Sequence, residues 1–151
     1  MGKSYCFRLD SDQSVIACAF TVSNDSIKVN SLPNSRKKKL VKSIPRPKQF
    51  RSYPAVLIGR LGVNQNHKGA GIRRELMDFI KSWFIDPNNK TGCRFMVVDA
   101  YNEPIPIKYY TQNDFEFLFS TEEQEKEYMG LLVDDQLKTR LMYFDLIVLA
   151  S

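Results

Sequence analysis

The sequence predicts a single α/β domain with a mixed, mostly antiparallel central sheet flanked by helices, and three observations support this class. Two stretches rich in β-branched and aromatic residues, 5–8 and 14–23, flank a polar turn at Asp10-Ser11-Asp12, which is typical of a hairpin. Strand-like and helix-like segments then alternate from residue 55 to residue 119. All 151 residues fit one domain, which is large enough to bury a hydrophobic core.

The expected elements follow from apolar spacing and from turn residues. Residues 30–54 contain four prolines and the run Arg36-Lys37-Lys38-Lys39, so we expect a long basic loop with one helical turn around residues 38–43. Beyond this loop we expect strands at 55–63, 93–100, 115–119 and 141–149, helices at 72–84 and 107–112, and a charged helix opened by the capping sequence at 121–124 and interrupted by Gly130.

Composition excludes several classes of protein. A hydrophobic content of 43% and a charged content of 26% are typical of a folded, soluble domain, and no apolar run is long enough to span a membrane. The polar start of the chain and three widely spaced cysteines favour a reduced, cytoplasmic protein without a metal site. A net charge of +5 suits an anionic partner such as a nucleotide or RNA.

The most informative stretch is the strand-loop-helix junction from Leu61 to Arg74, which contains the sequence Asn66-His67-Lys68-Gly69-Ala70-Gly71. A helix N-terminus has unpaired N–H groups, and glycines let that backbone approach an anion closely. Arg73 and Arg74 add positive charge. The junction therefore predicts a phosphate or pyrophosphate site, although a tight turn whose glycines serve geometry alone would read the same way.

This junction resembles the pyrophosphate loop of the GNAT acyltransferase family, R/Q-x-x-G-x-G/A. A second block, from Val97 to Asn102 and on through Tyr109-Tyr110 to the segment 113–118, is similar to the family's strand-Asn-helix-Tyr-x-x-x-G-F segment. The two blocks stand in the family's order and cover roughly residues 53–119. Two departures are Asn66, where the family usually has Arg or Gln, and Asp114, where it usually has Gly.

The resemblance implies the GNAT fold, in which two central parallel strands splay apart and acetyl-CoA lies in the gap. The family's first strand and two helices would precede the hairpin, and we expect this chain to lack them. Either the basic loop at 30–54 takes their place, or the acceptor site is unusually open. Leu61 and Val63 would pair with the pantetheine arm, the Leu61 N–H would polarise the thioester, and Asn102 would bind the arm from the far strand. The cofactor-binding residues implied in this way are Leu61, Gly62, Val63, Lys68, Gly69, Ala70, Gly71, Ile72, Arg73 and Asn102.

The chemistry needs a neutral amine and a proton for the leaving thiolate. Tyr110 lies five residues before Phe115, which is the family's spacing for the general acid, and Tyr109 is the alternative. Packing alone could also explain both tyrosines. No base stands out: Asp99 is a candidate on position, proton loss through water is equally acceptable, and His67 reads as a loop residue.

The leading hypothesis is an acetyl-CoA-dependent N-acetyltransferase that acts on a primary amine of a small molecule, a protein or an aminoacyl-tRNA. The alternatives are a catalytically weak GNAT-fold module that binds acyl-CoA, and a generic α/β interaction domain. The expected partners are the amine acceptor, with tRNA as a candidate through the basic run at residues 36–39, and a homodimer is compatible with the sequence. No membrane association is expected.

Overall fold

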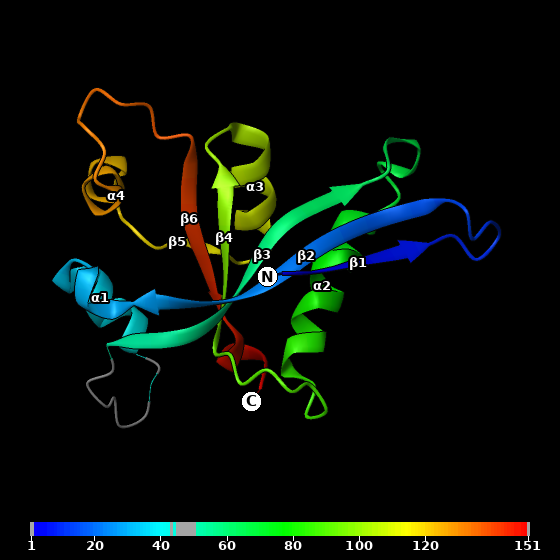
Figure 1. Cartoon of the computed structure of the whole chain (residues 1–151), viewed down its shortest axis with the longest axis horizontal. Helices are drawn as coiled ribbons and strands as arrows, with labels where there is room; N and C mark the ends of the chain where they lie inside the picture. The colour runs from blue at the N-terminus through cyan, green and yellow to red at the C-terminus, as the bar shows by residue number, and fades with distance from the viewer. Residues whose placement is uncertain (1, 43, 45–50, 151) are drawn as a thin grey trace.

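The computed structural model describes residues 2–42, 44 and 51–150. Six strands form one sheet in the order β1-β2-β3-β4-β6-β5, in which β3 and β4 are parallel and the other neighbours are antiparallel (Figure 1). The mixed, mostly antiparallel sheet expected from the sequence is confirmed. The strands are β1 (Lys3–Arg8), β2 (Ile16–Lys28), β3 (Ser52–Val63), β4 (Phe95–Tyr101), β5 (Glu116–Phe117) and β6 (Thr139–Asp145), and the helices are α1 (Asn34–Val41), α2 (Ile72–Ile85), α3 (Pro104–Gln112) and α4 (Glu122–Met129).

Each face of the sheet has its own hydrophobic cluster. On one face α2 and α3 pack over β4 and β6, and the buried side chains include Met77, Ile80 and Met96. On the other face Leu40 of α1 packs with Phe95 and Val97 of β4. Helix α4 lies next to β6 (Figure 1). No helix in the described ranges is both long enough and apolar enough to cross a membrane.

A β-bulge sets the course of β3. Leu61 pairs with Phe20 and Ile58 pairs with Val22, so Gly59 and Arg60 together face the single residue Thr21. The extra residue bends the strand and increases its twist. The parallel pairing of β3 with β4 runs from Ala55 to Ile58 and ends at this bulge, although both strands continue. From there β3 and β4 diverge, as Figure 1 shows.

The basic segment is more ordered than the sequence suggests. Instead of one helical turn, residues 34–41 form helix α1, which the Arg36 guanidinium fixes by donating to the carbonyls of Phe117 and Leu118. Lys39 forms an ion pair with Glu116. The predicted end of the helical turn, residue 43, and the prolines at 45 and 47 lie outside the described residues.

Several boundaries differ from the sequence-based expectations, each for a local reason. Strand β3 begins at Ser52, before Pro54, because residues 52–54 pair with residues 26–28 of β2. Helix α3 begins at Pro104, since proline suits the first turn of a helix. The last strand ends at Asp145, whose carboxylate accepts the Ile147 N–H and opens a short 3-10 helix.

The strand expected at 115–119 is reduced to two residues, since only Glu116 and Phe117 pair with β6, and the turn before it has an unusual backbone. Asp114 has φ 65°, a left-handed conformation that side chains other than glycine adopt at a cost. The buried ammonium of Lys81 donates to the Asn113 carbonyl at 2.6 Å, and it lies 3.8 Å from the Asp114 carboxylate. Burial lowers the pKa of Lys81, and Asp114 opposes this effect.

Asp114→Gly should stabilise the fold by about 1 kcal/mol, because glycine adopts a positive φ without a Cβ penalty. The lost ion pair should cost little, since the Asp114 side chain is 83% exposed. The free energy of unfolding from urea titration measures the gain, and Asp114→Asn controls for the charge. A destabilised glycine variant would mean that Lys81 depends on Asp114 more than on the Asn113 carbonyl.

Gly59→Ala should destabilise the fold by about 1–3 kcal/mol through overpacking. A Cβ at position 59 would lie 2.6 Å from the Thr21 Oγ1, the atom that holds the bulge. Gly62→Ala on the same strand is the matched control, because a Cβ there meets nothing within 4 Å. Urea titration of both variants should separate them, and equal stabilities would show that the bulge tolerates a side chain.

Candidate functional site

Two adjoining cavities occupy the gap that opens where β3 leaves β4. The first, of about 800 Å³, lies between the β3–α2 loop and α3, and we call it the basic cavity. The second, of about 550 Å³, lies between the splayed ends of β3 and β4, and we call it the splay cavity. Val63, Arg73, Ile105 and Tyr109 line both cavities, so together these form one continuous cleft.

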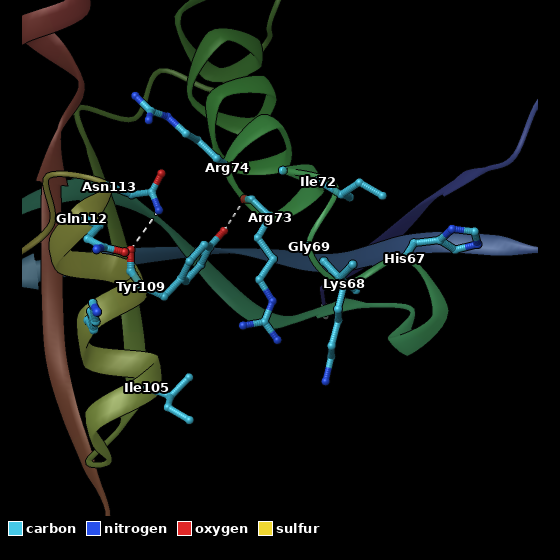
Figure 2. A pocket seen from close by; sticks show the side chains of 13 residues that line it. His67, Lys68, Gly69, Ile72, Arg73, Arg74, Ile105, Tyr109, Gln112 and Asn113 are labelled. Carbon is cyan, nitrogen blue, oxygen red and sulfur yellow. Dashed lines mark hydrogen bonds between the residues drawn. The ribbon is translucent and has the colours of Figure 1, made fainter.

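The basic cavity is electropositive. His67, Lys68, Arg73, Arg74 and Lys108 contribute to its lining, and none of the described lining residues is acidic. Figure 2 shows Lys68 and Arg73 extending in the same direction from the loop and the start of α2. Clustered positive charges attract and retain an anionic ligand.

Backbone groups add to this positive field. Gly69 and Gly71 have φ 98° and 75°, left-handed conformations that turn the loop into α2, and Gly71 is the N-cap residue. Within the described chain the backbone N–H groups of residues 69–73 donate to no protein acceptor. Unpaired N–H groups at the start of a 14-residue helix are a suitable site for a phosphate.

The splay cavity is lined from both faces of the sheet. Residues 59–63 of β3 form one wall and residues 99–101 of β4 form another, and the rest of the lining comes from Arg73, from Ile105, Pro106 and the two tyrosines of α3, and from Thr139. Because the β3–β4 ladder ends at Ile58 and Val98, the β4-facing edge of β3 pairs with no strand of the described chain beyond that point. An extended group bearing amides could therefore pair with this edge as an added strand does.

The two neighbouring tyrosines on α3 differ in what their hydroxyls do. The Tyr109 hydroxyl donates to the Arg73 carbonyl at 2.7 Å and so ties α3 to the first turn of α2 (Figure 2). The Tyr110 hydroxyl makes no hydrogen bond to any described residue, and Tyr110 lines the splay cavity. Burial raises the pKa of both phenols, which keeps both protonated near neutral pH. Tyr110 is thus the tyrosine with a proton available to a ligand in the cleft.

The cleft brings together most of the residues that the sequence singled out. Of the eleven residues predicted as catalytic or cofactor-binding, nine line one or both cavities: Leu61, Gly62, Val63, Lys68, Gly69, Gly71, Ile72, Arg73 and Tyr110. Ala70 belongs to the same loop but lines neither cavity. Asn66 also lies outside both, and its N–H donates to the Asn64 side chain.

Asn102 is placed differently from the expectation. Its side-chain amide donates to the Glu122 carboxylate and to the Leu137 carbonyl, both at 3.0 Å, and it lines neither cavity. These bonds fasten the end of β4 to α4 and to the segment before β6. A contact from Asn102 to a ligand stays a prediction that this arrangement does not favour.

Sequence reasoning missed a set of residues on α3. Ile105, Lys108 and Gln112 line the basic cavity together with Tyr109, which the sequence had already named, and the four are at helical spacing. That spacing is visible in the sequence, but the expected helix began at 107 and so excluded Ile105. The helix starts earlier, at Pro104, because proline is compatible with a first helical turn.

Comparison of the sequence with protein-family models and with curated proteins finds no match. The structure, in contrast, resembles several solved structures. AtaT complexed with acetyl-methionyl-tRNAfMet has a TM-score of 0.66 at 16% identity, over 97% of this chain and 72% of that chain. AtaTR bound with AcCoA has a TM-score of 0.63 at 14% identity, over 98% and 74% of the two chains. A tyrosine-to-phenylalanine mutant of KacT has a TM-score of 0.59 at 18% identity, over 89% of this chain and 65% of that chain.

The likeness extends over nearly the whole described chain. In this chain the aligned part contains the sheet in which the parallel pair β3 and β4 separates, and the glycine loop that leads from β3 into α2. These features are the ones that the resemblance in the sequence implied. The chain therefore has the GNAT fold.

Proposed function

We propose that this chain is an acetyl-CoA-dependent N-acetyltransferase that transfers the acetyl group to a primary amine. The observation that carries the proposal is the continuous cleft, in which an electropositive helix N-terminus adjoins a splayed strand pair with an unbonded tyrosine hydroxyl. A similar structure bound with AcCoA supports the choice of cofactor.

The two cavities match the two parts of acetyl-CoA. The pyrophosphate would lie on the N–H groups of residues 69–73, with Lys68 and Arg73 neutralising its charge. The pantetheine arm would run along the free edge of β3 at Leu61 and Val63. The thioester would then lie in the splay cavity beside Tyr110.

Two protein groups would act on the thioester in that position. The Leu61 N–H would donate to the carbonyl oxygen and stabilise the oxyanion of the tetrahedral intermediate. Tyr110 would protonate the departing sulfur, since its hydroxyl is protonated and makes no bond to a described residue. Tyr109 would act structurally, because its hydroxyl already donates to the Arg73 carbonyl.

Several classes of amine acceptor fit the proposed function. Aminoacyl-tRNA is supported by the likeness to AtaT, which was solved with acetyl-methionyl-tRNAfMet. The exposed lysine of α1, Lys38, and its neighbour Lys37 could contact phosphates, whereas Arg36 and Lys39 are engaged within the chain. An amine of a small molecule or a protein, and assembly as a homodimer, stay compatible with the fold.

Gly71→Ala should weaken acetyl-CoA binding about tenfold, or about 1.4 kcal/mol, by displacing the N–H groups that face the pyrophosphate. Gly130→Ala is the matched control: both glycines have a positive φ, and a Cβ at either meets nothing within 4 Å. Both variants should lose similar stability, but calorimetry should find weaker binding for position 71 alone. Equal affinities in the two variants would remove the pyrophosphate assignment.

Tyr110→Phe and Tyr109→Phe should have opposite profiles. Loss of the Tyr110 hydroxyl should lower turnover by about 10²-fold and leave stability unchanged, because that hydroxyl bonds to no described residue. Loss of the Tyr109 hydroxyl should cost about 1 kcal/mol of stability through its bond to Arg73, with a smaller effect on turnover.

Single-turnover rates and urea titration measure the two effects. Full turnover by Tyr110→Phe would transfer the acid role to Tyr109 or to a bound water. A parent protein that binds acetyl-CoA but acetylates no amine in a broad panel would instead support the alternative of a catalytically weak binding module.

A further inference from the structure

Asp99 follows directly after Val98, the last β4 residue that pairs with β3. Side chains alternate along a strand, and Val98 and Ala100 belong to the cluster that contains Tyr110. Phe95 and Val97 belong to the cluster under α1, so Asp99 lies on that opposite face. Both Asp99 and Tyr110 nevertheless line the splay cavity. The gap between the strands thus has a carboxylate on one face of the sheet and a phenol on the other.

The surroundings of Asp99 are those of a carboxylate kept basic. The Asp99 side chain is exposed, yet the protein around it desolvates its carboxyl group in part and so raises its pKa, and the charge of Asp25 on β2 raises this pKa further. From α4, Glu125 is near enough to interact with Asp99, but its own charge is paired with Arg140 at 2.8 Å. Arg60 of β3 lines the same cavity. No ion pair or hydrogen bond joins the Asp99 carboxylate to another described residue.

We infer that Asp99 is the base of the transfer reaction, which receives a proton from the primary ammonium of an acceptor that enters from the α1 face of the sheet. The inference rests on the proposed acetyltransferase function. The two substrates would then approach from opposite faces of the sheet, because acetyl-CoA would lie on the α2–α3 face, where the basic cavity is. Asp25 and Asp99 add negative charge on the acceptor side, which favours a cationic amine.

The steps balance with the groups present. The ammonium gives one proton to Asp99, and the neutral amine forms a C–N bond with the thioester carbon. The C–S bond breaks as the sulfur takes the Tyr110 proton. The amide nitrogen then loses its excess proton to solvent, solvent reprotonates Tyr110, and Asp99 releases its proton. The overall products are the amide, the CoA thiol and one proton.

The inference can be tested without knowing the acceptor, by using two unreactive thioethers of CoA that match in shape. S-(2-aminoethyl)-CoA carries an ammonium beyond the sulfur, and S-propyl-CoA carries a methyl group in its place. Calorimetry would measure both with the parent protein, Asp99→Asn and Asp25→Asn. Asp25→Asn removes a nearby charge from the same face and is the matched control.

The preference is the affinity for the ammonium probe divided by the affinity for the propyl probe. This ratio should be at least tenfold higher in the parent protein than in Asp99→Asn. The affinity for S-propyl-CoA should stay within about twofold in all three proteins, and Asp25→Asn should keep most of the preference. Equal preferences in the parent and Asp99→Asn would overturn the inference and leave the acetyltransferase proposal intact. Failure of the parent to bind either probe would instead overturn the proposed function.

With an acetylated amine in hand, the pH profile gives a second readout. Asp99 accepts a proton when it is ionised, so the rate should fall as pH falls through its raised pKa. Asp25→Asn should move this acid limb to lower pH, because the negative charge of Asp25 raises the pKa of Asp99. A limb that does not move would show that another group controls it. Asp99→Asn should lose about 10²-fold in kcat/KM at neutral pH.

Discussion

The hydrogen bond from the Arg60 N–H to the Thr21 hydroxyl, at 2.7 Å, accommodates the extra residue of the β3 bulge. This bulge turns β3 away from β4 four pairs into their parallel ladder. Both cavities of the cleft depend on that divergence, because the splay cavity lies inside it and the basic cavity begins where β3 runs into the glycine loop. A regular β3 would stay paired with β4 and would leave no room between them.

The parts of the site that the sequence predicts are those with short-range causes. The glycine loop and the apolar stripe of α2 lie within one segment, so the candidate phosphate site can be proposed from local spacing alone. Tyr110 was identified by its distance from Phe115, and the structure adds the reason to prefer it over Tyr109, namely the bond between Tyr109 and Arg73. Neither phenol's hydrogen bonding can be inferred from the sequence.

The features that the sequence does not predict depend on residues far apart in the chain. Thr21 and Arg60 are separated by 39 residues, and nothing near either position indicates a bulge. Helix α1 is held by carbonyls 81 and 82 residues away, and Asn102 is held by Leu137, 35 residues away. Local propensity carries no information about such contacts. A basic segment with several prolines is therefore predicted to be a loop, and an asparagine at a strand end is predicted to bind a ligand.

Helix α2 is joined to the α3 region at two points. Near its start the Arg73 carbonyl accepts the Tyr109 hydroxyl, and further along the Lys81 ammonium donates to the Asn113 carbonyl. These points are separated by about 12 Å of helix. A body pinned at two points cannot pivot about either, so α2 and α3 form a stiff frame. The opposite wall of the cleft is the end of β3, which beyond the bulge pairs with β2 and not with β4, so the bending stiffness of this strand pair sets how far the cleft can widen.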